Sequence, residues 1–412
     1  MPHRNDWPGD EGEMRVLMSS GVNRQGEYPS ELHEILSLRR HREVRDEIIS
    51  WPGYVPTPLV SLVSLAERLG ISTLWYKDES RRFTLQSFKA LGGPFGVLQV
   101  LRQELRDRVG VDQVSGLDII AGAHRDLVSE ITVACATDGN HGRAVAWGAE
   151  LFGCRCVVYL PSATSSGREA AIAAYGADVV RVVGSYDEAV RRADTDAHQH
   201  GMRVVSDHAY PGYEQIPRAV MQGYSTLIEE VTDELMPGGI LRESEPSLTH
   251  VFVQAGVGGF AAAVFSYLWE MYGTERPIGI VVEPHGADCI YRSAEAGEPT
   301  PVPGMPHTLM ACLCTGEVST LAWPILREAA DAFITIPDAD ALRTMRLLAK
   351  GVGQDPALVA GESGVAGLAG LVRVAGEKQA RDALGLGPES RVLVVGTEGA
   401  TDPEIYRSIV GG

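Results

Sequence analysis

A lysine in an apolar stretch is the leading candidate for a reactive side chain in this sequence. Lys89 lies in the segment 78–93, DESRRFTLQSFKALGG, where its immediate neighbours are apolar or small. Lysines usually lie on solvated helix faces, and the pattern fits that interpretation too. An amine in an apolar setting, however, loses its proton readily and attacks carbonyl groups to form Schiff bases. Lys89 is therefore a candidate nucleophile.

A glycine-rich loop, QAGVGGF at 254–260, follows the apolar run THVFVQ and precedes the helical pattern AAAVFSYLWEMY. The backbone N–H groups of Gly256, Gly258 and Gly259 could approach an anion closely at the start of that helix. The spacing differs from the G-x-G-x-x-G pattern of dinucleotide sites. The pattern fits both a phosphate site and a plain glycine turn.

A polar turn, TDGNHG at 137–142, stands between the apolar run ITVACA and another helical pattern. Its Asp-Gly and Gly-Asn pairs are ordinary turn dipeptides. The turn also offers polar groups suited to an anionic substrate and a polar ring, from Thr137, Asp138, Asn140 and His141.

A threonine follows the last apolar run, RVLVV, in the loop GTEGATDP at 396–403. The hydroxyl of Thr397 would face whatever lies over the sheet, although a Ser/Thr turn or helix cap explains it equally.

Short apolar runs alternate with helical patterns from about residue 130 onward. The runs are continuous rather than alternating, which is typical of strands buried on both faces. Strand, helix and strand at this spacing predict an α/β fold with open, mostly parallel sheets and helices on both faces. Ligands bind such folds beyond the carboxyl ends of the strands. The predicted strands are 131–134, 157–160, 179–183, 204–206, 251–254, 278–282, 333–336 and 392–395, and the predicted helices are 142–152, 168–175, 186–200, 217–230 and 260–272.

The composition excludes several classes of protein. The chain has 412 residues and a formal net charge of −18, which disfavours nucleic acid and anionic membranes as partners. No apolar run approaches the roughly 20 residues that cross a bilayer. The polar N-terminus predicts no secretory signal, and six cysteines do not make a disulfide framework. We therefore expect a cytoplasmic protein.

Cys154 and Cys156 flank Arg155 in a C-x-C pattern. Because no second Cys/His pair follows at zinc spacing, we expect buried thiols and no metal site.

A carbonyl-capturing lysine, a glycine phosphate loop and an asparagine turn together suit pyridoxal 5′-phosphate. The sequence resembles the fold type II pyridoxal-phosphate enzymes, the tryptophan synthase β-like group, and within it the diaminopropionate ammonia-lyase family. The resemblance spans residues 57–406 and is carried by TPLVSL, YKDESRRFTLQSFKALGG, ACATDGNHGRAVAWGAELFG, SDHAYPGYEQIPRAVMQGYSTL, QAGVGGFAAAV, VEPHGADCIYRSA, GESGVAGL and GTEGATDPEIY.

The resemblance implies a role for each matching residue. Lys89 would form the Schiff base with the cofactor, Asn140 would bond its phenolic oxygen, and Thr397 would meet its pyridine nitrogen. The phosphate loop would comprise Gly256, Val257, Gly258 and Gly259.

The resemblance also implies the reaction, α,β-elimination of ammonia from D- or L-2,3-diaminopropionate to give pyruvate through aminoacrylate. Lys89 and Asp138 would move protons on opposite faces of the cofactor. Substrate contacts would come from Thr137, Asp138, His141, Asp207 and His208.

Several positions depart from the family pattern on the expected substrate side. The family's RFGLNAFK is RFTLQSFK here, DTAWEGYE is DHAYPGYE, and LACGE is LCTGE with Cys314 in a shifted place. The β-substituent of the substrate could therefore differ from an amine. A dehydratase or a β-replacement synthase acting on another β-substituted alanine is the alternative. An NAD-dependent oxidoreductase would leave Lys89 and the TDGNHG segment unexplained, and the presence of Lys89 and Asp138 disfavours a non-catalytic sensor.

The resemblance implies two domains in a homodimer. The large domain would comprise 1–96 and 221–412, with an N-terminal arm at 1–50, and the inserted small domain would comprise 97–220.

Overall fold

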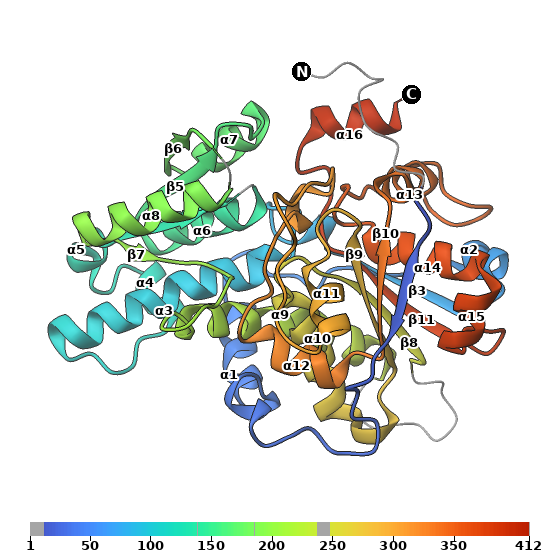
Figure 1. Cartoon of the computed structure of the whole chain (residues 1–412). Coiled ribbons are helices and arrows are strands. Elements are labelled where there is room, and N and C mark those ends of the chain that lie inside the picture. The colour runs from blue at the N-terminus through green and yellow to red at the C-terminus, as the bar shows by residue number, and fades with distance from the viewer. Residues whose placement is uncertain (1–11, 138, 185, 237–247, 412) are drawn as a thin grey trace. The chain divides into compact units, whose positions relative to one another are not determined.

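The computed structural model describes residues 12–137, 139–184, 186–236 and 248–411 (Figure 1). The chain divides into two compact units. The first contains the described residues of Met1–Ser37, Pro56–Arg81 and Leu227–Gly412, and the second contains Leu38–Val55 and Arg82–Thr226. The predicted small domain, 97–220, falls within the second unit, which extends further on both sides. The domain assignment stays a prediction.

The first unit is built on a seven-stranded sheet. Its inner strands are parallel, and the edge strands β1 and β2 run antiparallel to their neighbours. The order across the sheet is β1 (Arg15–Met18), β10 (Ala332–Ile336), β9 (Ile278–Pro284), β8 (His250–Gln254), β11 (Arg391–Gly396), β3 (Thr73–Asp78) and β2 (Leu59–Ser61).

Helices cover both faces of this sheet. On β9, Gly279 lies against Phe265 of α10, whereas Val282 lies against Gly370 of α14. Because side chains alternate along a strand, α10 and α14 lie on opposite faces. The helices of this unit are α2 (Val63–Leu69), α10 (Gly259–Tyr272), α11 (Cys289–Ala296), α12 (Ala322–Ala329), α13 (Asp338–Lys350), α14 (Ala366–Gly376), α15 (Lys378–Leu384) and α16 (Pro403–Val410), with short 3-10 turns at Leu32–Glu34, Glu79–Arg81, Gly273–Glu275 and Ala311–Leu313.

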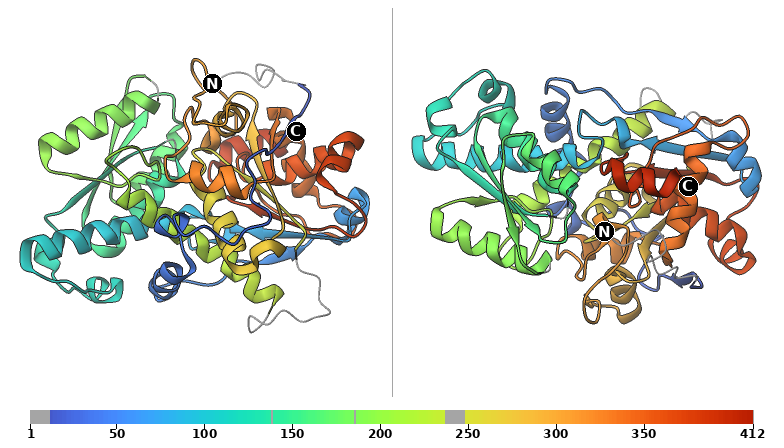
Figure 2. Two further views of the ribbon diagram at one scale, coloured as in Figure 1. Left: turned by 60° about the horizontal axis from the view of Figure 1, so that its bottom comes forward. Right: turned by 90° about the horizontal axis from the view of Figure 1, so that it is seen from above.

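The second unit is built on a parallel four-stranded sheet in the order β6 (Asp178–Val182), β5 (Arg155–Pro161), β4 (Thr132–Ala136) and β7 (Arg203–Val204). Val158 lies against α6 and the adjacent Tyr159 packs on α8, so these helices cover opposite faces. Figure 2 shows both sheets from two further directions. The helices are α1 (Leu38–Ile49), α3 (Lys89–Val109), α4 (Gly116–Ile120), α5 (Arg125–Val128), α6 (Asn140–Phe152), α7 (Ser166–Ala173) and α8 (Tyr186–His200), and α9 (Gln215–Leu235) carries the boundary between the units.

The α/β fold with two mostly parallel sheets is confirmed, and all eight predicted strands are present. The run at 204–206 is the poorest match, because β7 contains only Arg203 and Val204. Sequence periodicity missed β1, β2 and β3. The first two are edge strands of four and three residues, and β3 contains the polar residues Thr73, Lys77 and Asp78.

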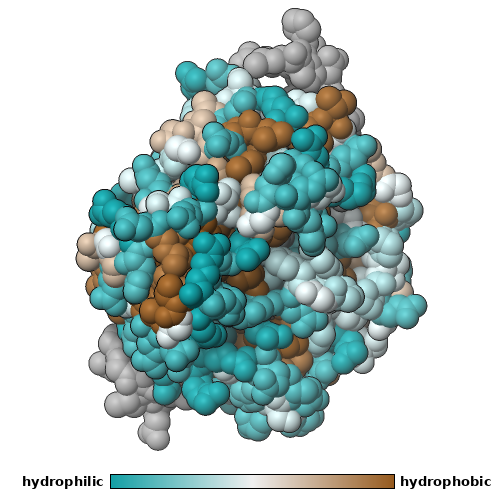
Figure 3. Space-filling view, turned by 90° about the vertical axis from the view of Figure 1, so that its left-hand side faces the viewer, coloured by the Kyte–Doolittle hydropathy of each residue, from teal (hydrophilic) through white to brown (hydrophobic). Residues whose placement is uncertain are grey.

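Within the described residues, no helix is long and apolar enough to cross a membrane. The face drawn in Figure 3 is mostly hydrophilic, with smaller apolar areas among the polar side chains. All six cysteines lie in the described residues, and each is a free thiol.

Candidate active site

Lys89 is the first residue of α3, and its side chain is only 16% exposed. The glycines that follow it explain this burial. A Cβ at Gly92 would lie 2.5 Å from the Val220 carbonyl oxygen of α9, and a Cβ at Gly93 would lie 2.8 Å from the Ala144 Cβ of α6. Both helices therefore approach the start of α3 closely. The Lys89 amine lies 5.0 Å from the centre of the Phe88 ring, in the apolar setting that the sequence predicts.

Three of the predicted residues meet at this amine. Lys89 Nζ forms an ion pair with the carboxylate of Asp207, and His141 Nδ1 lies 3.8 Å from the same carboxylate oxygen. The three residues come from the start of α3, the start of α6 and the segment after β7. An amine, a carboxylate and an imidazole in contact can bind a polar substrate and transfer protons.

The electrostatics set the charge of each group. Burial alone would raise the pKa of Asp207, but the surrounding positive charges and hydrogen bond, those of Lys89 foremost, together outweigh burial and lower this pKa overall. Burial lowers the pKa of His141, so its imidazole is neutral at neutral pH. His141 Nε2 donates to the Val205 carbonyl at 2.9 Å, which leaves Nδ1 unprotonated and, among the described residues, without a hydrogen-bond partner. Burial also raises the pKa of the nearby Tyr224, which therefore stays a neutral phenol.

The TDGNHG turn is held by its own threonine. The Thr137 hydroxyl accepts hydrogen bonds from the backbone N–H groups of Gly139 at 3.0 Å and Gly142 at 3.1 Å. A Cβ at Gly142 would lie 2.2 Å from Thr137 Cγ2, so this contact requires glycine. Thr137 thus positions the start of α6, where Asn140 is buried. Asp138 lies outside the described residues.

The glycine loop connects β8 to α10 in the first unit. Gly258 caps the helix with a φ of +93°, and a Cβ there would lie 2.9 Å from Leu326 Cδ1. The Val257 carbonyl accepts a hydrogen bond from the Ser319 N–H at 2.9 Å. A tight glycine turn before the unpaired N–H groups of a helix start is a cradle for a phosphate.

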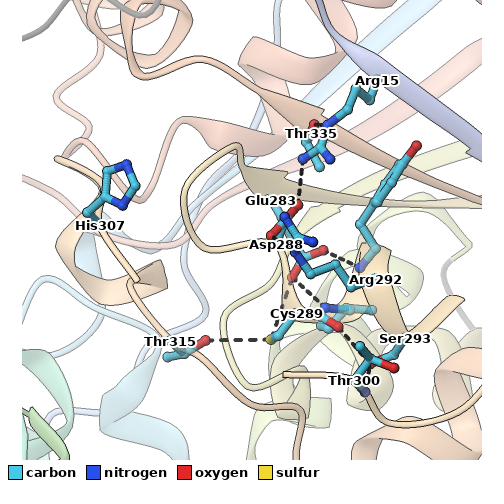
Figure 4. Close-up of polar contacts among 12 residues, drawn as sticks. Arg15, Glu283, Asp288, Cys289, Arg292, Ser293, Thr300, His307, Thr315 and Thr335 are labelled. Atoms are coloured by element: carbon cyan, nitrogen blue, oxygen red, sulfur yellow. Dashed lines mark hydrogen bonds and ion pairs between the residues drawn. The ribbon is translucent and has the colours of Figure 1, made fainter. Parts of the chain in front are cut away.

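A buried polar cluster adjoins this loop (Figure 4). The Cys289 thiol donates to the Gly256 carbonyl at 3.7 Å, and Glu283 accepts the N–H groups of Ile290 at 2.9 Å and Tyr291 at 2.7 Å. Burial raises the pKa of Glu283 to about 8. The cluster therefore fixes the start of α11 against Gly256.

Thr397 follows β11, and its hydroxyl accepts a hydrogen bond from Gln254. The sequence patterns indicated no role for Gln254. Gln254 is only 2% exposed, and its Nε2 atom lies 3.0 Å from the carbonyl oxygens of Gly364 and Val395 and 2.9 Å from Thr397 Oγ1. The two N–H groups of this amide are shared among the three acceptors. The two carbonyls fix the orientation of the amide, and an amide nitrogen cannot accept a hydrogen bond. The Thr397 proton must therefore point away from Gln254, which makes this hydroxyl a donor. A buried amide directly before the glycine loop was the available signal.

The remaining predicted residues are placed as follows. His208 is partly buried, and its backbone N–H donates to the Ser206 hydroxyl at 3.1 Å. Cys156 is buried and Cys154 partly so, and burial raises the pKa of both thiols. Across the described ranges, no group of three or more His, Cys, Asp or Glu side chains could hold a metal ion.

Comparison with known proteins gives consistent matches. A family model described as pyridoxal-phosphate dependent enzyme matches residues 50–398. The diaminopropionate ammonia-lyase of Escherichia coli (strain K12) is 40% identical over 365 residues, which cover 87% of this chain and 88% of that protein. Crystal structures of the E. coli diaminopropionate ammonia lyase, at 36% identity and with 97% of both chains covered, match with TM-scores of 0.86 in complex with D-serine and 0.84 with an aminoacrylate-PLP azomethine reaction intermediate.

Proposed function

This chain belongs to the pyridoxal-phosphate-dependent enzymes and, within them, to the diaminopropionate ammonia-lyase family, and from that premise we propose that it eliminates ammonia from 2,3-diaminopropionate to give pyruvate. The observation that carries the proposal is the ion pair of Lys89 with Asp207 beside His141. It provides the amine that would capture the cofactor's aldehyde, together with groups that transfer protons.

The described residues fit pyridoxal phosphate. Lys89 would hold the aldehyde covalently, and the glycine loop would bind the phosphate through its N–H groups. Thr397, whose proton points away from Gln254, would donate to the ring nitrogen. Asn140 would bond the phenolic oxygen. When bound, the cofactor stabilises negative charge at the substrate's Cα.

Side chains of the protein would transfer the protons in the reaction. The Lys89 amine would take the Cα proton at Nζ, and the carboxylate of Asp207 would stabilise the resulting ammonium. Asp138, outside the described residues, is the proposed base for the opposite enantiomer. Asp207 would also attract the β-ammonium group of the substrate, with Thr137, His141 and His208 as further contacts. A hydroxy-amino acid lacks this β-ammonium charge, so two carboxylates favour a diamino substrate over serine or threonine.

A product assay tests the proposal. The holoenzyme is incubated separately with D- and L-diaminopropionate, D- and L-serine, L-threonine and larger β-substituted alanines, and pyruvate or the corresponding 2-oxo acid is measured with ammonia. We expect the highest kcat/KM with diaminopropionate. Faster turnover of a hydroxy-amino acid would identify a dehydratase instead. Turnover that appears only when a second nucleophile is added would identify a synthase.

We further propose that the chain acts in the cytoplasm as a homodimer, as its family resemblance and acidic composition suggest. Sedimentation equilibrium of the holoenzyme would test the assembly, since a homodimer of this 44.3 kDa chain has twice that mass. A single species at the monomer mass would contradict it.

A further inference from the structure

A surface pocket in the first unit lies among α2, α13 and α14, which are neighbours at the right of Figure 1. Its volume is about 500 Å³, which is within the usual range for small-molecule sites. None of the residues assigned above to cofactor or substrate lines it. Its apolar lining comes from Leu65, Leu69, Leu347, Ala369 and Val372.

Charged side chains surround this apolar lining: Arg68, Arg343, Arg373, Asp340 and Glu377. Arg373 pairs with Glu377 at 2.7 Å, and Arg343 forms an ion pair with Asp340 Oδ1. Three guanidinium groups against two carboxylates leave the pocket with one excess positive charge.

Among the described residues, one carboxylate oxygen of the pocket has no hydrogen-bond donor and one guanidinium group has no partner. Asp340 is 7% exposed, and its Oδ2 atom is buried with no hydrogen-bond donor from the described part of the chain. A buried carboxylate oxygen without a donor is costly and uncommon in native structures. Arg68 is exposed and makes no hydrogen bond or ion pair with any described residue. The pocket lining therefore combines a carboxylate with one buried, unpaired oxygen, an exposed guanidinium group and an apolar surface.

We propose that this pocket binds a free α-amino acid with an apolar side chain. The ammonium group would donate to Asp340 Oδ2, which supplies the missing donor. The carboxylate would pair with Arg68 and Arg343, since guanidinium groups match carboxylates in shape and charge. The side chain would lie on Leu69 and Val372. Such a ligand stabilises the folded protein when it binds, because only the folded state forms the site.

Calorimetric titration of the holoenzyme with L-leucine tests the proposal. Leucinamide lacks the carboxylate and 4-methylpentanoate lacks the ammonium group, so both should bind more weakly. Arg68→Gln removes the exposed cation, whereas Asp340→Asn removes the negative charge and replaces one of the two acceptor oxygens with an NH2 group. Each should weaken leucine binding by about tenfold or more. Lys350→Gln removes a positive charge from the exposed end of α13 outside the pocket and should bind leucine like the wild type.

The visible absorbance, recorded in the same titration, distinguishes leucine binding in this pocket from binding in the active site. We expect binding heat and a raised Tm with no change in the cofactor's absorption band. The absence of leucine binding at millimolar concentration would overturn the proposal. Equal leucine affinity in the wild type and Arg68→Gln would show that the ligand binds elsewhere, which would also overturn the proposal. Binding heat that is accompanied by a change in the cofactor's absorption band in both proteins would have the same consequence.

Discussion

The Lys89 amine is positioned by residues that lie far apart in the sequence. Its ion-pair partner Asp207 is 118 positions away, and the glycines after Lys89 bring α6 and α9 close enough to bury it. The apolar surroundings increase the effect of the Asp207 charge, because solvent screens it weakly there. At this scale, the proposed chemistry depends on one amine and the carboxylate that faces it.

Replacement of the amine should remove both the covalent link and the base. We expect Lys89→Ala to lose the visible absorbance of the bound cofactor and to reduce pyruvate formation by roughly a thousandfold or more. Borohydride reduction followed by peptide mass analysis should find a pyridoxyl group on the Lys89 peptide of the wild type only. Lys350→Ala, at the exposed end of α13, serves as the control. An unchanged spectrum in Lys89→Ala would exclude Lys89 from the mechanism.

The Gln254 amide should set the direction of the Thr397 proton. In Gln254→Glu a carboxylate would accept that proton and turn it away from the cofactor's ring nitrogen. We expect cofactor affinity, measured by fluorescence titration of the apoenzyme, to fall by about tenfold and the absorption band to shift. Gln254→Leu removes the donor without capturing the proton, so its band should shift less. Identical spectra for both variants and the wild type would contradict this role for Gln254.

At the scale of elements, glycines decide how closely the helices approach the strands and one another. The first turn of α6 depends on Gly142, because only a residue without a side chain lets the Thr137 hydroxyl accept hydrogen bonds from two backbone N–H groups. The loop before α10 depends in the same way on Gly258, whose positive φ disfavours any other residue. These turns place Asn140 and the glycine loop at the carboxyl ends of β4 and β8.

A methyl group at Gly142 should disrupt the turn. We expect Gly142→Ala to lower the free energy of unfolding by about 2–4 kcal/mol, because its Cβ would overlap Thr137 Cγ2. Urea unfolding followed by circular dichroism measures this change. Glu150→Ala, on the exposed side of the same helix, should change stability by less than about 0.5 kcal/mol. Equal stabilities of Gly142→Ala and wild type would show that the turn tolerates the extra methyl group.

At the scale of the whole molecule, ionisable groups in the interior link folding to pH. Glu283 is fully buried beside the glycine loop, and burial raises its pKa from 4.5 to about 8. Below pH 4.5 the carboxyl group is protonated in both the folded and the unfolded chain. Above that pH the unfolded chain loses the proton while the folded chain retains it, so Glu283 reduces stability progressively up to about pH 8.

Glu283→Gln should therefore flatten the dependence of unfolding free energy on pH. Between about pH 5 and pH 8, we expect the Glu283 carboxyl group to lower the free energy of unfolding of the wild type by on the order of a few kcal/mol. The variant should not show this decrease. Urea unfolding at intervals across this range measures the slope for both proteins. Parallel slopes would show that the carboxyl group ionises alike in the folded and unfolded chains.

The sequence by itself was sufficient to predict eight strands of the two sheets, five of the helices and the chemical identity of the candidate residues. Buried parallel strands appear in the sequence as continuous apolar runs. The glycine loop and the TDGNHG turn are each one unbroken stretch of sequence, so local patterns were sufficient to predict the strands and both motifs. The short edge strands β1 and β2 were missed because they lie before residue 130, outside the regular alternation of apolar runs and helical patterns.

Only the tertiary structure decided which side chains meet. Asp207 reaches Lys89 across 118 positions at the start of α3, where glycines allow α6 and α9 to approach closely. Gln254 reaches Thr397 across 143 positions because β8 and β11 are neighbouring parallel strands. Neither hydrogen bond has a local sequence pattern. The neutral state of His141 and the donor direction of Thr397 follow from burial and from the orientation of neighbouring carbonyl groups, which packing alone establishes.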